Sequence, residues 1–223
     1  MALAFALLQG GANHFGTDFS PDPAAKGTVT YTENGQRVAR LPDGFYSSDA
    51  YADKLVAQLA QSRQGGGAER PFFAYLTFTA PHWPLQAPAD DIARYHGRYD
   101  AGFEALRRER LARQEALGLV APGTVAHTPR LQAGGWDWLS AGQKRTAARN
   151  MEIYAAMVDR LDRNVGKVLA ALRASGELDN TVILFLADNG AEGIDTETSG
   201  ATFFKDRLKG IDNSFANRGT ATS

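Results

Sequence analysis

Two short apolar runs, each bounded by turn-forming residues, stand out in the pattern of hydrophobic and polar positions. The first is Pro71-Phe-Phe-Ala-Tyr-Leu-Thr-Phe78, and the second is Thr181-Val-Ile-Leu-Phe-Leu-Ala187. A continuous apolar run of this length is typical of a strand that is covered on both faces, as in a parallel sheet. Both segments are therefore predicted to be buried strands.

Helical periodicity is clearest between the two runs, in a segment that begins at Ser140 and ends near Gly176. Apolar residues recur there at steps of three and four, which predicts one long amphipathic helix. The predicted apolar stripe consists of Met151, Tyr154, Val158, Leu161, Val165, Val168 and Leu172. Gly176 stands where a glycine commonly ends a helix.

Shorter elements complete the pattern. Ser47-Ser48-Asp49 predicts the N-terminal cap of a helix that continues to about residue 63, and residues 88–118 predict an exposed, charged helix. Asn34-Gly35 predicts the tight turn of a β-hairpin over residues 28–41, and residues 194–223 predict a loop-like tail.

The first eight residues, which are apolar, predict a buried strand or the end of a helix. Strand, helix and strand in this order predict an α/β fold with a parallel-rich central sheet flanked by helices, as a single domain over residues 1–223.

Composition narrows the classes of function. Lys and Arg number 24 against 25 Asp and Glu, so the net charge of -1 provides no basic field for nucleic acid or anionic lipid. The chain has no cysteine, which excludes disulfides, thiolate metal sites and a cysteine nucleophile. No apolar run is long enough to predict a membrane span, and the apolar start lacks the basic residues of a signal peptide. The compartment stays open between the cytoplasm, as the default, and the periplasm.

Candidate chemistry follows each apolar run. His82 lies between Pro81 and Pro84, which restrict the backbone and so limit the directions of the imidazole. Asp188 and Asn189 are oxygen donors of the kind that suits Ca²⁺ or Mg²⁺, although the same residues also form ordinary turns. Ligands bind at the carboxyl ends of strands in open α/β sheets, which favours a functional role for His82. Taken alone, Asp188-Asn189-Gly190 favours an ordinary turn.

The two motifs together resemble the arylsulfatases of the sulfatase family. The resemblance rests on Phe73-Ala-Tyr-Leu-Thr-Phe-Thr-Ala-Pro-His-Trp-Pro-Leu-Gln-Ala-Pro88 and Ile183-Leu-Phe-Leu-Ala-Asp-Asn-Gly-Ala-Glu-Gly193, with Tyr154-Ala-Ala-Met-Val-Asp-Arg-Leu-Asp-Arg163 between them. It implies an alkaline-phosphatase-like α/β fold and hydrolysis of small-molecule sulfate esters.

By matching position, the resemblance implies that His82 contacts the sulfate group near the leaving oxygen. It implies that Asp188 and Asn189 are two ligands of a divalent cation, usually Ca²⁺.

The chain also departs from the family pattern. The residue that the family oxidises to formylglycine, the nucleophile, belongs to a Cys-x-Pro-x-Arg or Ser-x-Pro-x-Arg segment that this sequence does not contain. In the family, the remaining metal and sulfate ligands belong to a segment that comes before the part matched by this chain. The family also has a later lysine, and the sequence context of Lys205 and Lys209 does not match it. The resemblance therefore predicts an internal part of the catalytic domain, truncated at both ends, whose N-terminal part is missing. The chain alone is predicted to be inactive.

Two other functions stay open: a phosphate-ester or phosphonate hydrolase of the same superfamily, and a non-catalytic remnant. Among the remaining residues, His14 and His96 favour structural or exposed roles, and His127 favours a solvated loop. Trp136-Asp137-Trp138 suits either the mouth of a substrate site or packing at a helix end.

Overall fold

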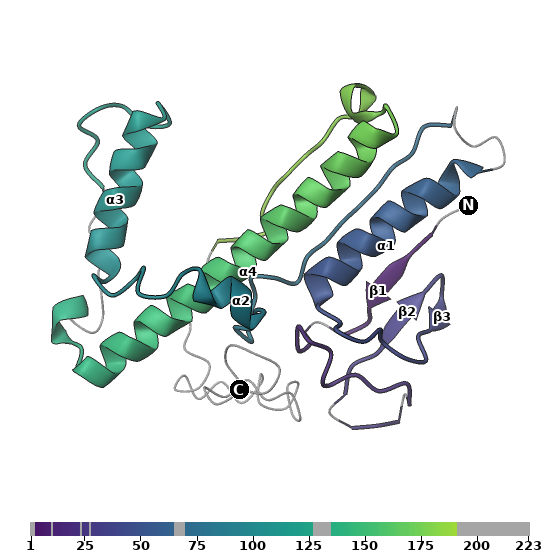
Figure 1. The fold of residues 1–223 in the computed structure, drawn as a ribbon, viewed down its shortest axis with the longest axis horizontal. Helices are drawn as coiled ribbons and strands as arrows, with labels where there is room; N and C mark the ends of the chain where they lie inside the picture. Colours follow the sequence, from purple (N-terminus) through teal and green to yellow (C-terminus); the bar gives the residue numbers. More distant parts are fainter. Residues whose placement is uncertain are drawn as a thin grey trace.

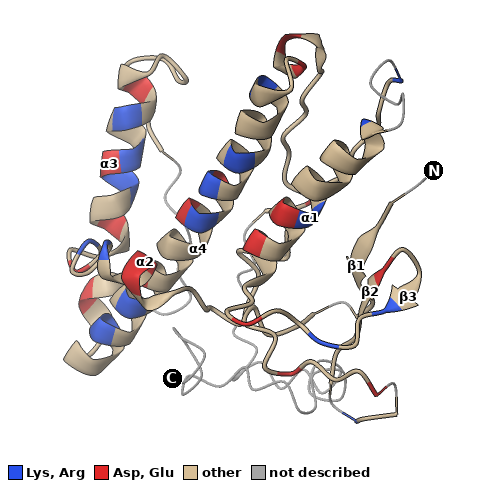
Figure 2. Cartoon of the chain, turned by 45° about the vertical axis from the view of Figure 1, so that its right-hand side comes forward, with Lys and Arg blue, Asp and Glu red and all other residues tan. Residues whose placement is uncertain are grey.

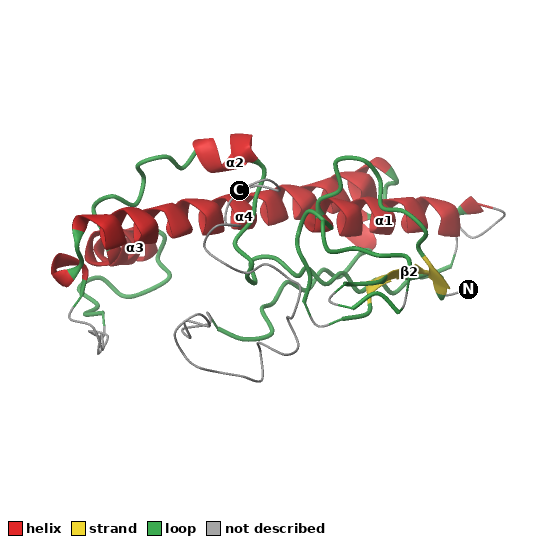
Figure 3. Ribbon diagram, turned by 90° about the horizontal axis from the view of Figure 1, so that it is seen from below, coloured by secondary structure: helices red, strands yellow, loops and turns green. Residues whose placement is uncertain are grey.

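The structure of the chain is a computed structural model that describes residues 3–9, 11–22, 24–26, 28–64, 70–126 and 135–190. The helices Ser47–Ser62, Phe103–Ala116 and Ala141–Ala174 lie in one layer (Figures 1 and 3). The short helix Ala89–Ala93 packs on the last of these, and a small sheet lies on the opposite side, beneath the first. The elements are β1 (Phe5–Leu7), β2 (Tyr31–Glu33), β3 (Gln36–Arg37), α1 (Ser47–Ser62), α2 (Ala89–Ala93), α3 (Phe103–Ala116), the 3-10 turn Trp136–Trp138, α4 (Ala141–Ala174) and the 3-10 turn Leu178–Asn180.

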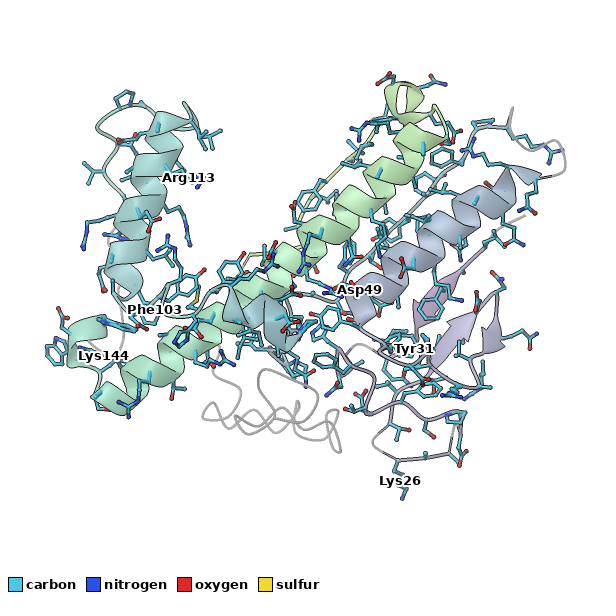
Figure 4. The ribbon with its side chains drawn as sticks, viewed as in Figure 1. Lys26, Tyr31, Asp49, Phe103, Arg113 and Lys144 are labelled. Atoms are coloured by element: carbon cyan, nitrogen blue, oxygen red, sulfur yellow. The ribbon has the colours of Figure 1, made fainter. Side chains whose placement is uncertain are left out.

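The predicted hairpin is confirmed in the small sheet. Strands β2 and β3 pair antiparallel around Asn34 and Gly35, whose φ angles of 51° and 80° give the turn that joins tightly paired strands. Strand β1 pairs antiparallel with the other edge of β2, so residues 5–7 of the apolar N-terminal run form a strand, which is half-buried rather than buried. The sheet packs its Tyr31 side chain, which is fully buried, against Phe5 and Phe45 below α1 (Figure 4).

Helix α4 confirms the predicted long helix. The Ser140 hydroxyl accepts a hydrogen bond from the backbone N–H of Gln143, whose side chain accepts from the backbone N–H of Ser140. This reciprocal cap satisfies two backbone donors that the first turn leaves without helical partners. At the other end Gly176 takes a φ of 74°, the left-handed conformation that favours glycine.

The buried face of α4 differs from the predicted apolar stripe. Ile153, Ala156 and Met157 are fully buried against Ile92 of α2, whereas Val158 is exposed. Glu152, a charged residue outside the predicted apolar stripe, is buried, and its carboxylate accepts a hydrogen bond from the N–H of Gly97 at 2.8 Å. The helix is therefore rotated relative to the prediction, and hydrogen-bonded polar groups occupy part of its packed face.

Helices α1 and α4 lie side by side and run in the same direction (Figure 1). Successive ion pairs between them join Asp49 to Arg160, Asp53 to Lys167, and Arg63 to Glu177 just beyond α4. Because both members of each pair advance along the sequence together, the ion pairs define a parallel packing.

Two helix predictions need correction. Ser47 and Ser48 are buried in the first turn of α1, and the N-cap position is Tyr46, so these serines do not cap the helix. The single helix predicted over residues 88–118 is instead α2 and α3, separated by turns in which Gly97 and Gly102 take positive φ angles. The exposed character predicted for this segment holds for α3, which has no buried residue.

The prediction of two buried strands is wrong for the described structure. Residues 71–78 and 181–187 are extended but pair with no strand, and Phe73, Tyr75, Val182 and Leu184 are each more than 80% exposed. Only alternate side chains of the first segment, Leu76 and Phe78 among them, pack on the core below α1. Among the described residues no neighbouring strand covers the other faces, and the only sheet is antiparallel.

Several predictions lie outside the described residues: the tail over residues 194–223, with Lys205 and Lys209, and His127 in its loop. None of the helices in the described part of the chain combines the length and hydropathy that a bilayer crossing requires.

Candidate active site

His82 lies in an irregular loop, residues 79–86, that joins the first extended segment to α2. Pro81 and Pro84 both follow cis peptide bonds. The backbone N–H of His82 donates to the carbonyl of Thr79 at 3.0 Å, which closes a tight turn. The His82 side chain is exposed to solvent. The loop therefore presents an imidazole at the surface on a hydrogen-bonded backbone.

The protonation of the His82 ring follows from its contact. Nδ1 lies 2.7 Å from the carbonyl oxygen of Trp83, which can only accept, so Nδ1 carries a proton. The ring also packs on the Trp83 indole, with 4.8 Å between centroids. Nε2 is therefore the nitrogen that remains for an external ligand, and it donates a hydrogen bond only when the ring is protonated on both nitrogens.

His14 is buried beneath this loop, in agreement with the structural role expected for it. Its Nε2 lies 2.9 Å from the carbonyl oxygen of His82, and its Nδ1 lies 2.9 Å from the hydroxyl of Ser47. Burial lowers the pKa of His14 to about 4; the bond to the His82 carbonyl opposes this shift, and the charge of His82 adds to it. His14 is therefore neutral near pH 7. No periodicity or motif in the sequence indicates this contact.

Asp188 and Asn189 end the second extended segment and are both exposed. The Asp188 carboxylate accepts from the backbone N–H of Asn189 at 3.0 Å, and the Asn189 amide donates to the carbonyl of Gly190 at 2.7 Å. Because the amide nitrogen of Asn189 is engaged, its oxygen is oriented away from that bond. One carboxylate and one amide oxygen are donors for a hard cation.

The predicted site residues interact locally in this structure. The side-chain hydrogen bond of His82 goes to Trp83, and those of Asp188 and Asn189 stay within residues 188–190. In the described ranges no group of three or more histidine, aspartate or glutamate side chains is arranged to hold a metal ion. The structure thus exposes the histidine and the acid–amide pair at the ends of two extended segments without a contact between them.

Comparison with known proteins decides the family. A model of the sulfatase family matches residues 9–212, which include His82, Asp188 and Asn189. The chain belongs to the sulfatase family.

Relatives of this sulfatase chain are similar over most of its length. An uncharacterised sulfatase of Schizosaccharomyces pombe is 42% identical over 99% of the chain and 40% of its own length. An arylsulfatase of Klebsiella aerogenes is 40% identical over 84% of the chain and 39% of its own length. A multifunctional alkaline phosphatase superfamily protein of Trinickia caryophylli is 26% identical over 69% of the chain and 29% of its own length. The chain spans about two fifths of the first two relatives.

A charged cluster in this sulfatase chain joins α1, α2 and α4 (Figure 2) and was not predicted from the sequence. Arg160 of α4 donates to Asp49 of α1 and, at 3.0 Å, to Asp91 of α2, which also binds Arg163. Burial acts to raise the pKa of Asp49, but hydrogen bonds from Arg160 and Asn164 outweigh it and lower the pKa. The cluster fixes the three helices around the start of α1 (Figure 4).

The cluster reaches the His82 loop through Tyr46. The Arg160 guanidinium lies 5.7 Å from the centre of the Tyr46 ring, and the Tyr46 hydroxyl donates to the carbonyl of Gln86 at 3.0 Å. Burial, followed by the charge of Asp49, raises the pKa of Tyr46, so the hydroxyl stays a donor. The packing of the helices is thereby coupled to the backbone of the loop.

The remaining candidates, His96 and the two tryptophans of the 3-10 turn, lie at the surface or pack against a neighbouring helix. His96 is exposed and lies 3.8 Å from the Glu152 carboxylate. Trp136 is buried against Phe103, at the end of the molecule where Lys144 also lies, so it packs a helix end (Figure 4). Trp138 is 81% exposed.

Proposed function

We propose that this chain is part of a catalytic domain that hydrolyses small-molecule sulfate esters. The observation that carries the proposal is the sulfatase match over residues 9–212, a range that contains His82 and the Asp188–Asn189 pair. Both positions are solvent-exposed at the ends of extended segments, where a substrate can reach them. We place His82 and this pair at a single sulfate and cation pocket.

The proposed role of His82 is to stabilise negative charge. With Nδ1 donating to the Trp83 carbonyl, a doubly protonated ring directs its second N–H, on Nε2, at an external oxygen. A donor at this position stabilises the sulfate group or the leaving oxygen as its charge develops. Removal of such a group typically lowers a rate by roughly 10²–10⁴-fold.

The side chains of Asp188 and Asn189 are of the chemical type that binds a divalent cation. They offer a carboxylate and an amide oxygen, which suit Ca²⁺, but Ca²⁺ takes about six to eight oxygen ligands. Further ligands would therefore come from residues outside the described set. A bound cation would neutralise charge on the oxygens of the transferring group.

The proposed domain continues beyond these 223 residues. The exposed faces of residues 71–78 and 181–187 suit strand neighbours that complete a parallel-rich, alkaline-phosphatase-like sheet, with residues 1–223 as one partial domain. The formylglycine nucleophile would come from the same additional polypeptide, since the chain has no cysteine and no serine in the required motif. The chain alone is expected to show no turnover.

A chimera tests the proposal. The segment of the Klebsiella aerogenes arylsulfatase that matches this chain is replaced by the chain, and hydrolysis of 4-nitrophenyl sulfate is measured with added Ca²⁺. We expect activity that falls by about 100-fold or more in Asp188→Ala and His82→Ala, but not in the exposed control Asp179→Ala. A folded chimera without activity, or one insensitive to Asp188→Ala and His82→Ala, would contradict the proposal.

A phosphate-ester or phosphonate hydrolase is the second candidate, favoured by the similarity to the multifunctional alkaline phosphatase superfamily protein. Sulfate and phosphate esters need the same neutralisation of oxygen charge, so a metal and a proton donor serve both. Parallel assays of the chimera with 4-nitrophenyl phosphate separate the two functions. Faster hydrolysis of the phosphate ester would favour the second candidate.

A further inference from the structure

Buried polar side chains from two other segments hold the His82 loop from beneath. His14 Nε2 binds the carbonyl oxygen of His82 at 2.9 Å, and the backbone N–H of His14 donates to Gln86 Oε1 at 3.0 Å. The hydroxyl of Tyr46 donates to the Gln86 carbonyl. His14 and Gln86 are 1% and 0% exposed, so solvent does not compete for these bonds. They fix the loop backbone at its middle and at its end.

The two contacts of the His14 ring determine its tautomer. The carbonyl of His82 only accepts, so His14 Nε2 carries the proton. In the neutral ring Nδ1 then accepts from the hydroxyl of Ser47, which is itself 2% exposed in the first turn of α1. The backbone N–H of Ser47 also donates to the His14 carbonyl at 2.8 Å. A rotation of the ring would break both side-chain bonds in a site where His14 and Ser47 are almost fully buried from solvent.

The held carbonyl determines where the His82 ring points. The backbone N–H of His82 donates to the Thr79 carbonyl, and the His82 carbonyl accepts from His14 Nε2. His82 Nδ1 donates to the Trp83 carbonyl. With these three groups fixed, the direction of Nε2 is fixed as well.

Because burial keeps His14 neutral near pH 7, the ring that donates to the His82 carbonyl carries no positive charge. An imidazole that binds an oxyanion through Nε2, while its Nδ1–H is engaged, must be cationic. A second imidazolium at His14, bound to the His82 carbonyl, would repel that charge. A neutral donor to the His82 carbonyl avoids the repulsion and retains the bond.

We propose that His14 is a positioning residue: as the neutral Nε2–H tautomer, locked by Ser47, it holds the His82 carbonyl and so aims His82 Nε2 at an oxyanion. The identity of the anion as a sulfate group rests on the proposed function.

Nitrogen NMR of the histidine rings in the full chain tests the proposal, with inorganic sulfate as the probe. In the wild type at pH 7 we expect His14 protonated on Nε2 only, and sulfate to shift the His82 signals. His14→Leu removes the donor and should mix the His82 tautomers and weaken the sulfate response roughly tenfold. His14→Gln offers an amide donor and should restore much of both. His96→Leu, at an exposed histidine, serves as the control.

Each outcome decides between the claims. Protonation of wild-type His14 on Nδ1, or His82 signals that are unchanged in His14→Leu, would overturn the positioning role. If sulfate shifts no His82 signal in the wild type but His14→Leu still mixes its tautomers, the positioning role stands and the sulfate role of His82 fails. If both His14 variants fail to fold, Ser47→Ala decides: it retains the histidine but frees Nδ1, and a single unchanged set of His82 signals would overturn the proposal.

Discussion

Replacing Arg160 with methionine removes the guanidinium at the centre of the charged cluster while keeping an unbranched apolar stem. The wild-type guanidinium donates to both Asp49 and Asp91, whose side chains are 23% and 6% exposed. After the substitution two carboxylates stay mostly out of water with fewer partners. Loss of one member of a buried ion pair typically costs roughly 3–5 kcal/mol.

For Arg160→Met, the contacts that remain lower the expected loss of stability below that range. Arg160 is 27% exposed, Asp91 keeps Arg163, and Asp49 keeps the amide of Asn164. Solvent and these remaining donors offset part of the loss, so we expect a cost of about 2–3 kcal/mol. For a chain of this size, each kcal/mol lowers the melting temperature by roughly 2–4 °C.

Urea unfolding followed by far-ultraviolet circular dichroism measures the change. The matched control is Lys167→Met, one heptad further along α4, because Lys167 makes an exposed ion pair with Asp53 and should contribute about 0–0.5 kcal/mol. If Arg160→Met costs no more than Lys167→Met, then the cluster does not hold α1, α2 and α4 together, and the reasoning from burial is wrong.

Three further predictions concern stability. The pKa of His14 in the folded chain is about 4, against an ordinary value of 6.5, so the unfolded chain takes up a proton first as the pH falls. We therefore expect the free energy of unfolding to drop by about 3 kcal/mol from pH 7 to pH 4. This pH-dependent component should be missing in His14→Gln. Gly102→Ala should destabilise the chain and change Trp136 fluorescence, because Gly102 has a φ of 88° and an added Cβ would lie 2.4 Å from the Trp136 ring; unchanged stability and fluorescence would contradict this packing. Ser140→Ala should cost about 1 kcal/mol in a urea titration through loss of the cap of α4, and Ser140→Asn should retain most of the stability.

Local signals in the sequence predicted the elements whose causes are themselves local. Asn34-Gly35 specifies a turn by its own backbone preferences, and the reciprocal cap at Ser140 and the glycine at 176 define the ends of α4. These elements form in the structure where the pattern placed them. The hairpin is shorter than predicted, because only Tyr31–Glu33 and Gln36–Arg37 pair.

Predictions that depend on distant partners were less accurate. The apolar run at residues 181–187 predicts a buried strand, but burial needs neighbouring strands that the described residues do not provide. Glu152 lies outside the predicted apolar stripe, but it is buried and accepts a tertiary hydrogen bond from Gly97. The contact of His14 with His82 spans 68 residues of sequence, and no local pattern encodes it.

The candidate site was found by motif and not by periodicity. His82 and the Asp188–Asn189 pair lie at the ends of the two apolar runs, as predicted, and the sulfatase match includes them. Their convergence stays a prediction, since the described contacts of each are local. The loop that carries His82 depends on buried side chains whose roles only the three-dimensional arrangement reveals.

A crystal structure of the arylsulfatase chimera, grown with Ca²⁺ and sulfate, tests the central claim most directly. We predict one Ca²⁺ ion with oxygens of Asp188 and Asn189 at about 2.3–2.6 Å, and a sulfate oxygen within about 3 Å of His82 Nε2 in the same pocket. A cation bound without Asp188 and Asn189, or a His82 ring that faces a separate surface, would contradict it.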